Sequence, residues 1–181
     1  MRAVTAFLAM CLLGFVVAPG QAHASNKWDT GATAGALGVP LAAGIISLVK
    51  DDWDGAWQLG FTYVATMGVT EGLKYTVDET RPDGGKHSFP SGHAASAFAG
   101  AAYLQRRYGW QYGVPAYAIG ALVGYARVHN DKHYWHDILA SAVIGSVAGF
   151  FITKPYNSPI HTSLLADPAT KTYGIQASMR F

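Results

Sequence analysis

Five long stretches of this sequence contain no charged residue, and they set the strongest limit on its fold. They cover residues 30–49, 55–70, 88–105, 108–126 and 138–153, each 16 to 20 residues long. A helix of that length spans roughly 24–30 Å, which is close to the thickness of the apolar core of a bilayer. The set predicts an all-α bundle of about five helices, embedded in a membrane. A soluble protein with buried helices is the alternative, because such stretches also build core helices.

The composition argues against several classes of protein and site. Half of the 181 residues are hydrophobic and only 13% are charged, against roughly a quarter charged in an average soluble domain. The net charge of +2 is too small to indicate a nucleic-acid partner. Cys11 is the one cysteine, which excludes an intramolecular disulfide and any cysteine-based zinc site.

The N-terminus is typical of a secretory signal. A basic start at Met1 and Arg2 precedes an apolar run over 6–18, and small residues follow around Ala24. Residues 1–24 are therefore predicted to be a signal peptide cut after Ala24, or else an uncleaved first transmembrane helix. Residues 25–153 form the predicted helical domain.

Residues 154–181 form a predicted C-terminal tail. Its end, 172–181, alternates loosely between apolar and polar residues and finishes in Phe181, as a strand of an outer-membrane barrel does. One strand cannot make a barrel, so no role is assigned to the tail.

Charges and histidines concentrate in two short windows, 71–87 and 127–137. Two predicted helices separate the windows, and an up-and-down path through two helices returns the chain to the same end of the bundle. The opposite end carries basic residues: Lys50, Arg106, Arg107 and Lys154. By the positive-inside rule that end is cytoplasmic, and the histidine-rich end faces the periplasm.

The first group of candidate site residues suits an anion. Lys74, Arg81 and Arg127 bring three cations to one end of the bundle, and such side chains bind phosphate oxygens. Ser91 and Gly92 begin a charge-free helix, whose free N–H groups and positive dipole end favour an anion. Taken singly, Lys74 could end a helix and Ser91 could be a simple N-cap.

The second group supplies reactive imidazoles. His133 and Asp137 are four residues apart, so on a helical turn they share a face, and the carboxylate can fix the imidazole tautomer. A fixed imidazole is a candidate nucleophile, and His93 is a candidate for proton transfer. The pair could instead be structural, and neighbouring histidines could hold a metal.

Three motifs together resemble those of the type 2 phosphatidic acid phosphatase superfamily, which includes class A acid phosphatases and vanadium haloperoxidases. They are Lys74-x6-Arg81-Pro82, then Pro90-Ser-Gly-His93, then Arg127-x5-His133-x3-Asp137. Ala126 stands where the family usually has Ser. The resemblance covers about residues 30–153, and the three-part motif is highly specific.

The resemblance implies a role for each matched residue. The phosphate would be held by Lys74, Arg81, Ser91, Gly92 and Arg127. His133 would be the nucleophile, Asp137 its orienting partner, and His93 the acid that protonates the leaving group. The implied reaction forms a phosphohistidine and needs neither a metal nor another cofactor. His87, His129 and His136 match no motif position and are expected in solvated loops or at the substrate entrance.

The sequence thus predicts an integral phosphatase of the inner membrane that acts on lipid phosphates from the periplasmic side. Phosphatidate, phosphatidylglycerophosphate, a polyprenyl pyrophosphate and lipid A each offer a suitable phosphate. A soluble periplasmic acid phosphatase for small esters is the first alternative, and a vanadate-dependent haloperoxidase is the second. An inactive lipid-binding or structural helical protein is a further alternative, which the full nucleophile and acid set disfavours.

Overall fold

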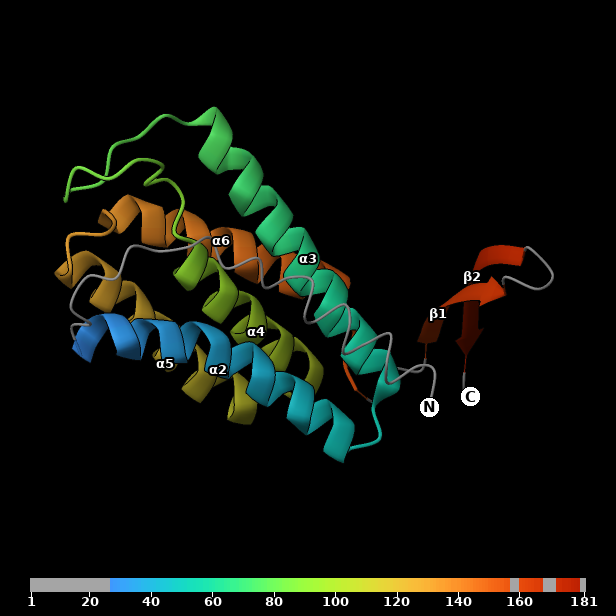
Figure 1. The fold of residues 1–181 in the computed structure, drawn as a ribbon. Coiled ribbons are helices and arrows are strands. Elements are labelled where there is room, and N and C mark those ends of the chain that lie inside the picture. Colours follow the sequence, from blue (N-terminus) through green and yellow to red (C-terminus); the bar gives the residue numbers. More distant parts are fainter. Residues whose placement is uncertain (1–26, 157–159, 168–171, 180–181) are drawn as a thin grey trace.

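The computed structural model describes residues 27–156, 160–167 and 172–179, and its main body is a bundle of five helices (Figure 1). The helices are α2 (Lys27–Val49), α3 (Trp53–Thr76), α4 (Gly92–Tyr108), α5 (Trp110–His129) and α6 (Trp135–Ile152). This architecture confirms the predicted all-α bundle. The predicted signal or first helix, residues 1–24, lies outside the described residues.

Two helix boundaries differ from the charge-free stretches. α3 continues past residue 70 to Thr76 and so carries Lys74 on its last turn. α4 begins at Gly92 rather than at residue 88, because Ser91 has extended backbone angles and is the N-cap. The loop between these helices, residues 77–91, is therefore longer than the sequence pattern suggested.

α4 lies in the middle of the bundle and contacts the other four helices (Figure 1). Its buried side chains are mainly those of alanine: Ala94, Ala95, Ala97, Ala99, Ala101 and Ala102. Small side chains let the neighbouring backbones approach closely, as in packed membrane bundles.

Two glycines of α6 bring that helix against α4. A Cβ atom added at Gly145 would lie 2.7 Å from the amide nitrogen of Ala99, which is backbone and cannot move aside. A Cβ atom at Gly149 would collide with the Cβ of Ala102. The Gly145-x3-Gly149 spacing therefore serves packing within the chain.

Large apolar side chains cover much of the outside of the bundle. They include Leu41, Ile45, Val64, Leu122, Leu139, Val143, Phe150 and Phe151. α2 and α6 are long and apolar enough to cross a membrane, and only 28% of the apolar window of each is buried within the protein. The core helix of a soluble protein would be mostly buried, so this surface favours contact with lipid.

The end opposite the histidine-rich windows is held by a buried ion pair. Arg107 donates through Nε to Oδ2 of Asp52 over 2.7 Å, and its Nη2 contacts Oδ1 of the same carboxylate. The hydroxyl of Tyr108 also donates to Asp52, and Arg107 donates to the carbonyl of Lys154. Arg107 is thus neutralised inside the bundle, and only the other basic residues at this end can act as surface topology signals.

The tail contains more regular structure than the sequence pattern predicted. β1 (Ile160–Asp167) and β2 (Thr172–Met179) pair as an antiparallel hairpin, with Ile160 opposite Met179 and Asp167 opposite Thr172. The hairpin projects from the bundle near the start of α3 (Figure 1). The alternating segment at the end of the chain is therefore one of two paired strands.

The Asp52–Arg107 pair should dominate the stability of its end of the bundle. Asp52→Ala leaves a buried guanidinium without its carboxylate, which costs about 3–5 kcal/mol in free energy of unfolding. We expect a clearly lowered melting temperature in detergent micelles. Asp51→Asn, at the exposed neighbouring position, is the control and should melt as the wild type does. An unchanged melting temperature for Asp52→Ala would contradict this assignment.

Candidate active site

The sequence-predicted site residues gather at one end of the bundle. Lys74 lies on the last turn of α3, Ser91 to His93 at the start of α4, Arg127 near the end of α5, and Asp137 on the first turn of α6. Arg81 lies in the loop 77–91, and His133 lies in the loop before α6. Helix ends and the two loops between them therefore build the site.

Asp137 is a fully enclosed polar group of the site. The residue is fully buried, and its Oδ2 accepts hydrogen bonds from Ser88 Oγ over 2.5 Å and from the Tyr134 amide over 3.0 Å. His133 Nδ1 lies 3.2 Å from the same oxygen. The spacing predicted that His133 and Asp137 share a helical turn, but His133 precedes α6, so the two residues do not lie on one turn. Instead Asp137 reaches back across the helix N-terminus.

The environment of His133 favours a neutral imidazole. Burial lowers the pKa of His133, and the nearby cations Arg127, Lys74 and Arg81 lower it further, against the opposing effect of Asp137. A neutral imidazole whose Nδ1 faces a carboxylate carries its proton there and leaves Nε2 with a free lone pair. The geometry therefore suits nucleophilic attack by Nε2.

At this end of the bundle two buried guanidinium nitrogens, Arg81 Nε and Arg127 Nε, have no hydrogen-bond partner among the described residues. A buried donor without an acceptor costs free energy, and an oxyanion is an acceptor of suitable charge. Lys74 Nζ donates to the carbonyl of Pro90 over 2.9 Å, which holds the ammonium beside the start of α4. The arrangement can bind an anion at the N-terminus of α4.

Gly92 is less constrained than the sequence suggested. A Cβ atom built there would lie 3.9 Å from its nearest neighbours, among them Lys74 and Glu71, which is ordinary contact. The expected close approach of the backbone is therefore not required by protein atoms at this position. The N–H groups at the start of α4 remain the feature that suits an anion.

α2 contributes two residues that the sequence analysis did not identify. Asp29 forms an ion pair with Arg127, and Thr33 Oγ1 lies 3.3 Å from His93 Nε2. The two residues are four apart and so share a face on the first turns of α2. Asp29 is the one acidic residue among the first 50, and that isolation was a signal available in the sequence.

Hydrogen bonds tie the two site loops together. Lys132 Nζ contacts Asp83 Oδ2 over 2.7 Å, and the Asp83 amide donates to the carbonyl of Asp131 over 3.0 Å. With the Ser88–Asp137 bond, these contacts join residues 77–91 to residues 130–137. Ser88 was also missed from the sequence, because a serine in a loop carries no periodic signal.

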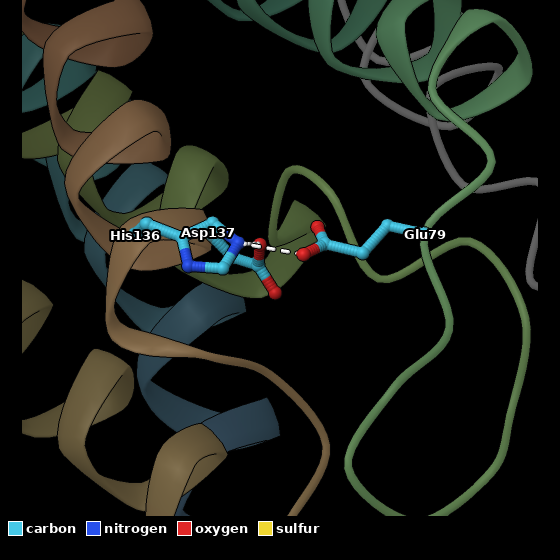
Figure 2. Close-up of side chains that lie close together, drawn as sticks. All are labelled: Glu79, His136 and Asp137. Carbon is cyan, nitrogen blue, oxygen red and sulfur yellow. Dashed lines mark hydrogen bonds and ion pairs between the residues drawn. The ribbon is translucent and has the colours of Figure 1, made fainter.

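The three remaining histidines near the site all have partners. His87 Nδ1 lies 2.9 Å from the carbonyl of Lys74, and His129 stacks on Tyr125. His136 Nε2 lies 2.7 Å from Glu79 Oε1 and 3.2 Å from Asp137 Oδ1 (Figure 2). The expectation of plain solvated loops is therefore incomplete, most clearly for His136.

Comparison with known proteins gives consistent matches. The model of the PAP2 superfamily matches residues 83–158. The lipid A 4'-phosphatase of Helicobacter pylori is 28% identical over 130 residues, which is 65% of this chain and 66% of that protein. The lipid A 1-phosphatase of Porphyromonas gingivalis is 37% identical over 87 residues, 45% of this chain and 19% of that protein. The matched segments thus leave a third or more of each relative uncovered.

A solved structure shares the fold. The first transmembrane PAP2 type phosphatidylglycerolphosphate phosphatase from Bacillus subtilis superposes with a TM-score of 0.57, at 20% identity, over 83% of this chain and 84% of that one. At that identity the likeness concerns the fold alone. It agrees with the helical bundle described above.

Anion binding should stabilise the folded protein. We expect inorganic phosphate or vanadate to raise the melting temperature, because a ligand at 100 times its Kd adds about 2.7 kcal/mol. Arg81→Gln should remove most of that shift, since it takes away a half-buried guanidinium whose Nε is buried and unpaired. Lys132→Gln, which alters the ion pair with Asp83 at the loop surface, is the matched control. Equal shifts in both variants would argue against an anion site at Arg81.

Proposed function

We propose that this chain, which matches the PAP2 superfamily model over residues 83–158 and is similar to two lipid A phosphatases, is a member of that superfamily and a metal-independent lipid phosphatase acting through a phosphohistidine. The observation that carries the proposal is the buried His133–Asp137 pair beside three cations at a helix N-terminus. Few other chemistries need a neutral imidazole, a fixed carboxylate and an anion cradle together.

In the first step the phosphate lies between Lys74, Arg81, Arg127 and the start of α4. His133 Nε2 attacks phosphorus, the bond from phosphorus to the leaving oxygen breaks, and His93 gives that oxygen a proton. Asp137 stabilises the positive charge that develops on the imidazole. The contact of His133 Nδ1 with Asp137 supports this role.

In the second step water attacks the phosphorus of the phosphohistidine. The phosphorus–nitrogen bond breaks, His93 takes the proton of the water, and inorganic phosphate leaves. His93 thus returns to its starting form, and no redox partner or metal enters the balance. The arginine and lysine charges stabilise the equatorial oxygens in both transition states.

The proposed substrate is a lipid phosphate monoester or pyrophosphate, with lipid A the first candidate. Two observations support it: the apolar outer surface of the bundle and the relatives named lipid A phosphatases. The test is phosphate release from a panel of lipid A, phosphatidate, phosphatidylglycerophosphate, undecaprenyl pyrophosphate and p-nitrophenyl phosphate, with and without EDTA. We expect a lipid to be preferred and EDTA to leave activity intact. Loss with EDTA and recovery with magnesium would refute the metal-independent proposal.

We further propose that the site faces the periplasm from the inner membrane. Single cysteines at Lys86 and Gln111, both exposed in the structure, report on the two ends when Cys11 is replaced. An impermeant thiol reagent added to intact spheroplasts should label the Lys86→Cys protein and spare the Gln111→Cys protein. Labelling of position 111 alone would reverse the orientation.

The two catalytic histidines should differ in their response to the leaving group. His133→Ala should abolish turnover of every substrate, because no other group forms the covalent intermediate. His93→Ala should lose about 10²–10⁴-fold with a lipid phosphate. It should recover partly with p-nitrophenyl phosphate, whose leaving group needs no proton.

Trapping of the phosphoenzyme under alkaline workup separates the roles directly. His93→Ala should still form the intermediate from p-nitrophenyl phosphate, and His133→Ala should not. The opposite pattern would exchange the two assignments. Equal losses with both substrates in both variants would leave His93 with a positional role.

A further inference from the structure

Three potential metal ligands converge beside the proposed catalytic pair. Glu79 comes from the loop 77–91, and His136 and Asp137 come from the first turn of α6 (Figure 2). One ligand atom from each of the three residues lies within 4.8 Å of the other two. In Figure 2 the carboxylate of Glu79 faces the imidazole nitrogen of His136, and the carboxylate of Asp137 lies close to the same nitrogen.

The second oxygen of Asp137 is the unusual member of this cluster. Asp137 is fully buried, and its Oδ2 takes donors from Ser88 and Tyr134 and faces His133. Its Oδ1 is buried too and has no hydrogen-bond partner in the described structure, although His136 Nε2 is 3.2 Å away. A buried, negatively charged oxygen aimed into a cluster of ligands is poorly satisfied without a cation.

We propose that Glu79, His136 and Asp137 form a site for a divalent cation of the zinc type, and that the bound cation inhibits the enzyme. Zinc binds histidine nitrogen and carboxylate oxygen at about 2.0–2.2 Å, so ligands at tetrahedral positions lie about 3.4 Å apart. The separations of 2.7 Å and 3.2 Å along Glu79–His136–Asp137 approach that spacing. A mixed nitrogen and oxygen donor set without sulfur suits zinc or a neighbouring transition metal.

The cluster can admit the ion from solvent. The His136 side chain is 57% exposed, and Glu79 keeps 27% of its side-chain surface accessible. The Glu79–His136 contact of 2.7 Å must open by about 0.7 Å to reach that tetrahedral spacing, and rotation about the side-chain torsions of Glu79 can supply this movement. Water can fill the remaining coordination position, as in other open zinc sites.

Inhibition follows from the shared carboxylate and rests on the proposed function. A cation on Oδ1 draws negative charge from Asp137, so Oδ2 becomes a weaker acceptor for His133 Nδ1. The imidazole then loses basicity, and attack by its Nε2 slows. None of the cation's ligands holds the phosphate, so kcat should fall while KM changes little.

Zinc binding is measured first, without activity. The full-length protein in detergent micelles competes with a chromogenic chelator for Zn²⁺. Because this assay needs no turnover, the His133→Ala variant can be measured too. We expect one ion bound in wild type and in His133→Ala, and an affinity at least about tenfold weaker in His136→Ala and Glu79→Gln. His129→Ala, which removes an exposed imidazole at the end of α5, should bind as the wild type does.

Inhibition is measured second, with p-nitrophenyl phosphate so that zinc does not bind a lipid. Zn²⁺ should lower kcat reversibly in wild type and His129→Ala, and the half-inhibiting concentration should rise at least tenfold in His136→Ala. Equal zinc sensitivity of His136→Ala and wild type would overturn the proposal, as would binding that is lost in His129→Ala. An inactive wild type that still binds zinc through His136 would contradict the proposed function and leave the metal site standing.

Discussion

Close packing around the small side chains of α4 is the constraint on which the rest of the structure depends. Four helices contact α4, and alanines and the α6 glycines let their backbones approach it. Helices held so closely leave little room for long or charged side chains in the middle of the bundle, and polar residues buried there, such as Thr62 and Thr66, have short side chains. Most charged groups therefore lie at the two ends, where loops and helix termini can hydrogen-bond them.

The two ends solve this problem in different ways. At one end Arg107 and Tyr108 donate to Asp52, so both oxygens of that carboxylate are hydrogen-bonded. At the other end Asp137 is satisfied on one oxygen only, and two guanidinium nitrogens lack acceptors. The first arrangement stabilises the fold, and the second is suited to binding, because unmade hydrogen bonds are available to a ligand.

Asp137 also links folding to the geometry of the site. The donors to its Oδ2 come from the loop 77–91 and from the loop before α6. A fully buried carboxylate is costly unless it is hydrogen-bonded, so both loops must be in place before it can be enclosed. The same contacts that stabilise these loops orient His133.

Much of the fold could be predicted from the sequence, because charged residues are excluded from helices that face lipid or a packed core. Counting two helices between the charged windows also placed both windows at one end. Asp29, Thr33 and Ser88 could not be predicted in the same way. They reach the site through tertiary contacts, and no spacing in the sequence relates them to His93, Arg127 or Asp137.

In the C-terminal tail, alternation in the sequence does not predict both strands, for a different reason. β2 has a visible alternation, whereas β1 reads Ile-His-Thr-Ser-Leu-Leu-Ala-Asp and alternates only weakly. Strand pairing is a relation between two segments, and a weakly patterned partner is found only when the pair is seen together.

The ion pair between Asp29 and Arg127 affects how the affinity of the site for an anion is interpreted. An incoming anion meets a guanidinium whose Nε is unpaired and whose Nη1 already contacts Asp29, so the anion competes with that carboxylate for the charge of Arg127. The measured free energy of anion binding is then the difference between the anion–Arg127 and Asp29–Arg127 interactions, so much of the electrostatic attraction cancels. Such an exchange discriminates by charge, since a dianion outcompetes the single negative charge of Asp29 more easily than a monoanion does. It also eases release, because the carboxylate can return to Arg127 as the anion leaves.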